Sequence, residues 1–275
     1  MSFGVENLTV RFGRVTALDE VSVVVRRGEV TALVGGDGAG KTTLLRTLAG
    51  LVEPTSGTVR RPGVGRLGYL PAGAGSWKNL TVAENVSFIG GAYGLSGADL
   101  ADRADPILER AGLADARDRL AGQLSGGMKT KLGFSLAMLH SPDLLVLDEP
   151  TTGVDPVSRI ELWRMISEAV ADGAAVVMAT TYMDEAERAA FVVLLGDGRV
   201  LLSGEPDELI GSMPGTIVET DAPVDSSLAW RVGPVFHEWF PWTVPDGLTG
   251  LRPDLEDVCI AAELRDRLIP VGDTQ

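Results

Sequence analysis

The first third of the chain changes from alternating to continuously apolar positions. Residues 8–12 and 21–25 alternate apolar and polar side chains, a period typical of strands with one exposed face. Residues 29–34 form a compact apolar strand, and a glycine-rich segment follows at once. Residues 41–49 then have the composition of a helix that ends at Gly50. The pattern therefore predicts a strand, a glycine-rich loop and a helix in direct succession.

The rest of the pattern predicts a helical middle followed by buried strands. Thr81 and Glu84 have the spacing of a capping box at a helix start. Asp105-Pro106 could restart a helix within its segment, because proline is well tolerated at a first helical position. Helices are predicted within 95–113, within 124–140 and from Asp155 to about 171. Apolar buried strands are predicted at 144–147 and 174–179, and a hairpin is predicted over 191–202.

Together these elements predict an α/β fold with two parts. Residues 1–210 hold an N-terminal antiparallel β subdomain, a parallel sheet, and a helical subdomain at about 78–140. From about residue 211 the composition changes, and proline, glycine and tryptophan become frequent. Residues 211–275 are therefore predicted to form a small C-terminal appendage.

Composition excludes several classes of function. The net charge of −14 disfavours a broad nucleic-acid surface and gives no polybasic patch for anionic lipid. A single cysteine, Cys259, excludes an internal disulfide, and two histidines are too few for a zinc cluster. No signal peptide and no stretch of 18 apolar residues is present, so we expect a cytoplasmic chain without direct membrane insertion.

The glycine-rich segment matches the pattern G-x-x-x-x-G-K-[ST] of a phosphate-binding loop. Glycines allow backbone N–H groups to turn toward phosphate oxygens, and the start of the following helix favours the same anion. Lys41 is expected to reach the β- and γ-phosphates and the Thr42 hydroxyl to bind Mg²⁺. A glycine-rich turn before an ordinary helix is the alternative, and Asp37 needs no role beyond turn formation. The predicted nucleotide-binding residues here are Gly35, Gly36, Asp37, Gly38, Ala39, Gly40, Lys41, Thr42 and Thr43.

Two acids, Asp148 and Glu149, end the apolar strand at 144–147. Ligands of such sheets sit at the carboxyl ends of strands. Asp148 is therefore expected to orient Mg²⁺, and Glu149 to act as the general base for an attacking water. A pair of solvated acids at a strand end is the alternative.

These motifs, with Leu124-Ser125-Gly126-Gly127-Met128 and the segment 151–155, make residues 1–210 resemble ABC transporter ATPases. The resemblance implies a P-loop NTPase core with a RecA-like parallel sheet, ATP and Mg²⁺ as ligands, and a head-to-tail dimer. In that dimer Ser125, Gly126 and Gly127 contact the partner's γ-phosphate, Phe12 stacks on adenine, and Asp155 lies at the dimer interface. The alternatives are a capped helix start for Ser125, a core aromatic for Phe12 and a helix cap for Asp155.

Two positions depart from the family pattern. The family usually has a glutamine where Ala72 stands and a histidine where Thr181 stands. Alanine cannot bind a metal, and threonine cannot carry a positive charge. Because losing one transition-state donor costs roughly 10²–10³ in rate, we expect this chain's own site to hydrolyse ATP slowly. The intact signature then favours a heterodimer with a second ABC ATPase, while a homodimer stays open.

The segment Arg252–Val258 and residues 81–95 are similar to the drug-export, daunorubicin-resistance type, with Cys259 at an aromatic position of that group. The expected partner is a membrane-spanning permease, which places the chain at the inner face of the membrane. Open alternatives are a non-hydrolysing regulatory subunit, a soluble ABC protein acting on ribosomes or DNA, and a small-molecule kinase.

Overall fold

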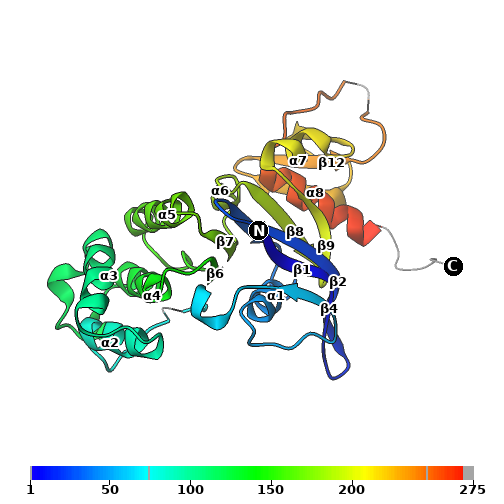
Figure 1. Ribbon diagram of the computed structural model, residues 1–275. Coiled ribbons are helices and arrows are strands. Elements are labelled where there is room, and N and C mark those ends of the chain that lie inside the picture. Colours follow the sequence, from blue (N-terminus) through cyan, green and yellow to red (C-terminus); the bar gives the residue numbers. More distant parts are fainter. Residues whose placement is uncertain (1, 74, 246, 269–275) are drawn as a thin grey trace.

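A six-stranded sheet forms the centre of the computed structural model, which describes residues 2–73, 75–245 and 247–268 (Figure 1). Its order is β5-β6-β7-β3-β8-β9, parallel throughout except for the antiparallel pair β8–β9. The strands are β3 (Val30–Val34), β5 (Leu67–Leu70), β6 (Leu144–Asp148), β7 (Ala175–Ala179), β8 (Phe191–Gly196) and β9 (Arg199–Gly204). Every residue of β3, β6 and β7 is buried, which explains their continuous apolar pattern.

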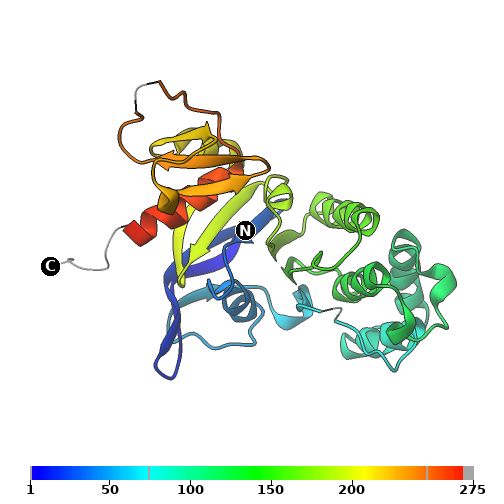
Figure 2. The same ribbon diagram turned by 180° about the vertical axis from the view of Figure 1, so that it is seen from behind.

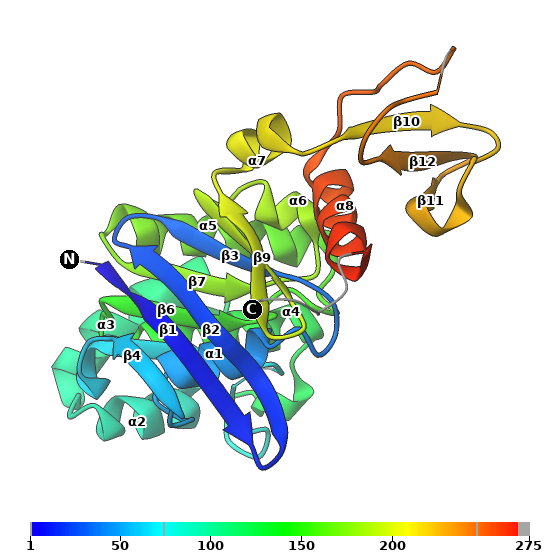
Figure 3. The same cartoon turned by 90° about the vertical axis from the view of Figure 1, so that its right-hand side faces the viewer.

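A second sheet and one helix cover one face of the central sheet. The strands β1 (Ser2–Phe12), β2 (Val15–Arg26) and β4 (Ser56–Arg60) pair antiparallel in the order β2-β1-β4. Helix α1 (Lys41–Leu48) lies between the two sheets, and Leu44, Leu45 and Leu48 are completely buried there. Figure 3 shows β1 and β2 crossing over this layer. The predicted N-terminal antiparallel sheet is thus present, with strands longer than the alternating segments alone indicated.

Three helices form a separate group that projects from the edge of the central sheet (Figure 1, left). They are α2 (Val82–Ala92), α3 (Gly97–Arg110) and α4 (Gly126–Met138). The capping box at Thr81 is confirmed, but a helix restart at Asp105-Pro106 is wrong, because α3 runs through Pro106 without a break. Ala104 and Leu108 are buried on either side of the proline, and this packing outweighs the local cost of about 3 kcal/mol. Short 3-10 turns lie at Val64–Arg66, Ala114–Ala116, Ala121–Gln123 and Ser226–Leu228.

The second half of the chain completes the core and adds a small sheet (Figure 2). Its helices are α5 (Pro156–Ala171), α6 (Met183–Ala186), α7 (Pro206–Ser212) and α8 (Leu255–Leu268). The small sheet consists of β10 (Thr216–Thr220), β11 (Ala229–Val232) and β12 (Val235–Phe240). Leu255, Val258 and Cys259 of α8 belong to the same apolar cluster as the central sheet. We therefore propose that the appendage is this small sheet with its loops, and that α8 is part of the main body.

None of the helices in the described residues combines the length and the apolar character that crossing a bilayer requires.

Candidate functional site

The glycine-rich loop joins β3 to α1 at the carboxyl end of the central sheet. Gly35, at φ 141°, leaves no room for a side chain, because a Cβ there would lie 2.2 Å from the carbonyl oxygen of Leu195. Gly40 caps α1 at φ 103° and contributes no side-chain acceptor to the first turn of the helix. The first amides of α1 therefore stay available to an anion.

Lys41 is buried and lies inside this loop. Its Nζ donates hydrogen bonds to the carbonyl oxygens of Gly35 at 2.6 Å and of Gly36 at 3.1 Å. The ammonium group therefore lies within the curve of the loop, where phosphate oxygens would replace the two carbonyl acceptors. Asp37 and Gly38 are exposed at the tip of the loop, and Ala39 is buried beneath it.

The fold brings Thr42 and Asp148 together, although 106 positions separate them in the sequence. The Thr42 hydroxyl donates to Asp148 Oδ1 at 3.1 Å. Burial raises the pKa of Asp148, with the hydrogen bond from Thr42 opposing the shift and the nearby Glu149 adding to it. Asp148 Oδ2 is buried and has no hydrogen-bond partner among the described residues, so it is an unsatisfied anionic oxygen that a cation would stabilise.

These residues fit a magnesium ion. Mg²⁺ is commonly held by one or two protein oxygens, with substrate phosphates and water completing its shell. Thr42 and Asp148 provide such a pair of oxygens beside the phosphate loop. Among the described residues no group of three or more His, Cys, Asp or Glu could hold a metal, so the ion would depend on the phosphates of its nucleotide.

Glu149 follows Asp148 with its backbone in the left-handed region, at φ 48°, which is uncommon for a residue with a side chain. Its N–H donates to the carbonyl oxygen of Ala179 at 3.1 Å, and its carboxylate accepts from the Thr152 hydroxyl at 3.2 Å. The carboxylate also lines a cleft of about 180 Å³ together with Gly126. Glu149 is thus held at the end of β6 with access to a cleft.

The segment Ser125–Gly127 begins α4. Ser125 is the N-cap, and its hydroxyl accepts from the N–H of Met128 at 3.3 Å. A Cβ on Gly127 would lie 2.2 Å from Ser158 Oγ of α5, so only glycine permits this helix contact. Ser125 and Gly126 are exposed and lie at the positive end of the helix dipole. A helix tip of this kind can receive a phosphate from another molecule.

Asp155 caps α5 as the sequence predicts. Its Oδ1 accepts from the backbone N–H groups of Val157 at 3.1 Å and Ser158 at 3.0 Å, and these hydrogen bonds lower its pKa. The side chain is exposed, so the cap leaves it accessible to a second subunit.

Three further predicted positions are Phe12, Ala72 and Thr181. Phe12 ends β1 opposite Val15, with 54% of its surface exposed, and its stacking on adenine stays a prediction. Ala72 is exposed just after β5, and Thr181 is exposed just after β7. Both substituted positions therefore follow strands of the central sheet at the edge where Asp148 ends β6.

One buried carboxylate near the site was missed by the sequence reasoning. Glu185 is completely buried, and its Oε2 accepts from the hydroxyls of Thr151 at 2.9 Å and Thr180 at 2.7 Å. Its Oε1 accepts from Arg159 at 3.3 Å. The network ties the segment after Glu149 to the segment before Thr181. Only the unusual burial of a carboxylate marks Glu185, and burial cannot be read from its exposed-looking neighbours in the sequence.

Known proteins resemble this chain over most of its length. The sequence pattern of the family described as "ABC transporter" matches residues 18–152. The "Probable multidrug ABC transporter ATP-binding protein YbhF" of Escherichia coli (strain K12) is 41% identical over 209 residues, which are 72% of this chain and 36% of that protein. The chain thus spans only about a third of that relative's length. The "Nod factor export ATP-binding protein I" of Ralstonia nicotianae is 37% identical over 217 residues, covering 75% of this chain and 68% of that protein. The protein of the same name from Paraburkholderia xenovorans is 35% identical and covers 82% and 78%.

Solved structures agree with these relatives. A structure described as the ATP binding subunit of an ABC transporter superposes with a TM-score of 0.70 at 31% identity, over 76% of this chain and 92% of the other. A nucleotide-free ATP-binding cassette from an ABC transporter gives a TM-score of 0.66 at 25% identity, over 74% and 92%. With its phosphate loop, Thr42–Asp148 pair and serine-capped α4 arranged on this fold, the chain belongs to the family of ABC transporter ATP-binding proteins.

Proposed function

We propose that the protein binds ATP with Mg²⁺ and hydrolyses it to power an export-type permease. The observation that carries this proposal is the meeting of the phosphate loop with Asp148, where the Thr42 hydroxyl lies 3.1 Å from Asp148 Oδ1. Phosphate and metal ligands thus share one edge of the sheet. The names of the relatives, multidrug and Nod factor export proteins, favour export.

The residues of this chain divide the chemistry among them. The amides at the start of α1 and the Lys41 ammonium bind and neutralise the phosphates. Thr42 and Asp148 would hold Mg²⁺, which would supply charge neutralisation to the transferred phosphoryl group. Glu149 orients water and accepts its proton at the carboxylate.

The exposed tip of α4 supports a dimer in which each chain completes the other's site. Ser125 and Gly126 project the positive end of α4 into solvent, where a partner's γ-phosphate would bind. We propose that Asp155 lies at the same interface. A second ABC ATPase subunit with the missing glutamine and histidine is the favoured partner, and a second copy of this chain is the alternative.

The absent glutamine and histidine support slow hydrolysis at this chain's own site. Ala72 and Thr181 follow β5 and β7 beside Asp148, yet neither side chain can bind Mg²⁺ or supply a cation. A regulatory subunit that binds ATP without turnover is the second candidate, and the same two residues favour it. The Glu149 carboxylate, which accepts a hydrogen bond from Thr152, favours residual turnover.

An apolar surface beside Ala72 supports docking of the permease. Trp77 and Phe88 are 46% and 55% exposed and pack edge to face with ring centroids 4.6 Å apart. Trp77 lines a cavity of about 720 Å³ together with Ala72 and Ile89, and Phe88 packs against the outer part of this wall through its contact with Trp77. Exposed aromatic patches of this kind commonly mark partner sites. Through such a contact the chain would stay at the cytoplasmic face of the membrane.

Calorimetry with Mg·ATP tests the binding site. Wild-type protein is expected to bind one nucleotide per chain, Lys41→Ala to weaken binding at least about tenfold, and the matched control Lys78→Ala to bind normally. Equal binding by the Lys41 and Lys78 variants would refute the proposed phosphate contact.

Steady-state ATPase assays test the slow site. Ala72→Gln combined with Thr181→His is expected to raise turnover by roughly 10² or more, since each change returns a transition-state donor. Glu149→Gln in the restored protein should abolish the gain. A wild-type rate that already equals the restored rate would contradict a slow site, while no turnover in either form would favour the regulatory alternative.

A further inference from the structure

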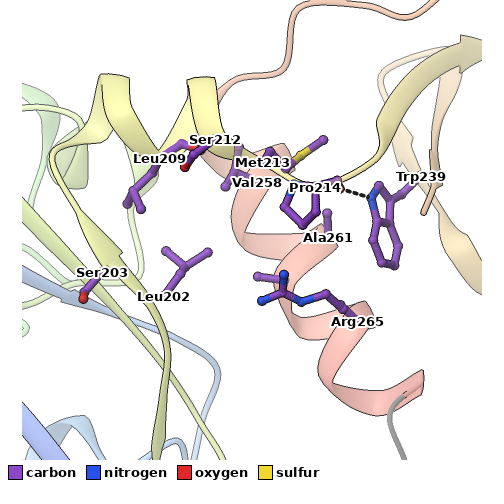
Figure 4. A pocket seen from close by; sticks show the side chains of 11 residues that line it. Leu202, Ser203, Leu209, Ser212, Met213, Pro214, Trp239, Val258, Ala261 and Arg265 are labelled. Carbon is purple, nitrogen blue, oxygen red and sulfur yellow. Dashed lines mark hydrogen bonds between the residues drawn. The ribbon is translucent and has the colours of Figure 1, made fainter. Parts of the chain in front are cut away.

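A pocket of about 280 Å³ lies where the small C-terminal sheet meets the main body, away from the phosphate loop (Figure 4). Its walls come from β9 and α7 on one side and from α8 and β12 on the other. Leu202, Leu209 and Val258 make the interior apolar, and the ring of Trp239 closes one side. The indole N–H donates to the carbonyl oxygen of Pro214 at 2.9 Å, which fixes this wall.

The pocket carries a positive charge in a strongly acidic molecule. The chain has 38 acidic and 24 basic residues, yet none of the residues that line this pocket is acidic and one, Arg265, is basic. Figure 4 shows Arg265 extending from α8 toward Leu202 of β9. In the described part of the chain Arg265 forms no ion pair within 4.0 Å, whereas Arg267 on the same helix pairs with Glu263 at 3.7 Å.

These features select one class of ligand. An apolar interior with a few convergent polar groups is the usual composition of a small-molecule site. A guanidinium group at its wall favours a planar carboxylate, which it can bind through two hydrogen bonds. Ser203 and Ser212 also belong to the lining, and the Ser212 hydroxyl donates to the carbonyl oxygen of Leu209 at 3.4 Å, which leaves Arg265 as the charged group that selects the ligand. A cation or a large polar solute would lose its hydration without compensation here.

We propose that this pocket is a binding site for a small amphipathic carboxylate, an apolar body of medium-chain length with a single anionic group. Arg265 binds the carboxylate, and the apolar body lies between Leu202, Leu209 and Val258. The lining of this pocket includes no residue of the nucleotide-binding group.

Calorimetry with octanoate on the full chain tests the proposal. Octanoate is expected to bind at one site per chain, and affinity should rise about fourfold per methylene from butanoate to octanoate. Octylammonium, with the same chain and the opposite charge, should not bind. Equal affinity for octylammonium, or no saturable binding of octanoate, would overturn the proposal.

Variants locate the site. Arg265→Gln is expected to weaken octanoate binding by about tenfold or more, because a charge-assisted contact is lost, while Arg265→Lys keeps part of it. Arg267→Gln, on the same helix but outside the pocket, is the matched control and should bind like the wild type. Ala262→Leu should block the pocket, with thermal unfolding as the check that it folds. If Arg265→Gln and Arg267→Gln bind octanoate equally well, the octanoate lies elsewhere and the proposal fails.

Discussion

The two carboxylate oxygens of Asp148 have different surroundings, and the difference has consequences for stability. Oδ1 accepts from Thr42, while Oδ2 is buried and finds no partner in the part of the chain that the structure describes. Burial raises the pKa of Asp148 above its ordinary value. The free energy of unfolding therefore falls as pH rises from the unfolded pKa through the folded one, because the charged form is less stable inside the protein. Above the folded pKa this cost is fully present unless a cation binds.

We expect Asp148→Asn to raise the Tm of the metal-free protein by a few degrees at neutral pH, since asparagine keeps an acceptor for Thr42 and removes the buried charge. This gain in Tm should vanish in acid, at a pH below the unfolded pKa of Asp148, because the side chain at position 148 is then uncharged in the wild type as well as in the variant. The same variant should lose the extra Tm that the wild type gains from Mg·ATP. Scanning calorimetry with and without ligand measures all three effects, and a lower Tm in the metal-free state would contradict the buried-charge argument.

A second residue-scale prediction concerns Cys259 on α8. Burial raises the pKa of this thiol to about 12, and the thiolate is the reactive form. We expect a thiol reagent at mildly alkaline pH to label the folded protein far more slowly than the protein unfolded in guanidinium. Mass spectrometry measures the rate of labelling. Rapid labelling of the folded chain would show that α8 opens readily.

At the scale of single elements, the N-cap positions of α2 and α3 can be compared directly, because only one of them forms a side-chain capping bond. The Thr81 hydroxyl accepts from the N–H of Glu84 at 3.1 Å, whereas Ser96 begins α3 without a side-chain cap bond. Thr81→Ala should cost about 1 kcal/mol in the free energy of unfolding, and Ser96→Ala should cost much less. Urea denaturation measures both, and equal costs would mean that the capping bond contributes little.

The contact between α4 and α5 makes the two signature glycines unequal. A Cβ on Gly127 would lie 2.2 Å from Ser158 Oγ, but a Cβ on Gly126 would meet only the Gly153 carbonyl oxygen at 3.6 Å. Gly127→Ala should therefore lower the Tm clearly, and Gly126→Ala should leave it near the wild-type value. Adding Ser158→Gly to Gly127→Ala should restore part of the lost Tm, because it removes the Ser158 side chain that the new Cβ would meet.

Sequence reasoning succeeded where the determining interactions are local. The phosphate loop at 35–42 and the helix cap at Asp155 depend on neighbouring residues, so their geometry follows from a short motif. Thr42 and Asp148 were each expected to serve one Mg²⁺, because ligands of such sheets sit at the carboxyl ends of strands, but their direct hydrogen bond was not predicted. The continuous α3 was missed because burial on both sides of Pro106 overrides its local preference, and the partners of Glu185 come from segments that only the fold brings together.

At the scale of the whole molecule, α8 joins the C-terminal segment to the main core. Leu255 is completely buried in the same apolar cluster as Leu194 of β8. Leu255→Ala should cost about 2–5 kcal/mol, the usual range for such a cavity. Urea denaturation monitored by fluorescence would measure this cost in the free energy of unfolding, provided that unfolding is a single cooperative transition. A cost below about 0.5 kcal/mol, as at an exposed site, would mean that α8 is not packed as the structure has it.

The position of α8 also bears on how the protein forms at the ribosome. Synthesis proceeds from the N-terminus, and domains generally fold as units while they emerge. The central sheet is complete in sequence at β9, yet the apolar surface that Leu255, Val258 and Cys259 cover stays open until α8 has been translated. A nascent chain paused between β9 and α8 would therefore expose part of its core, and chaperones that recognise apolar surface should bind it at that stage.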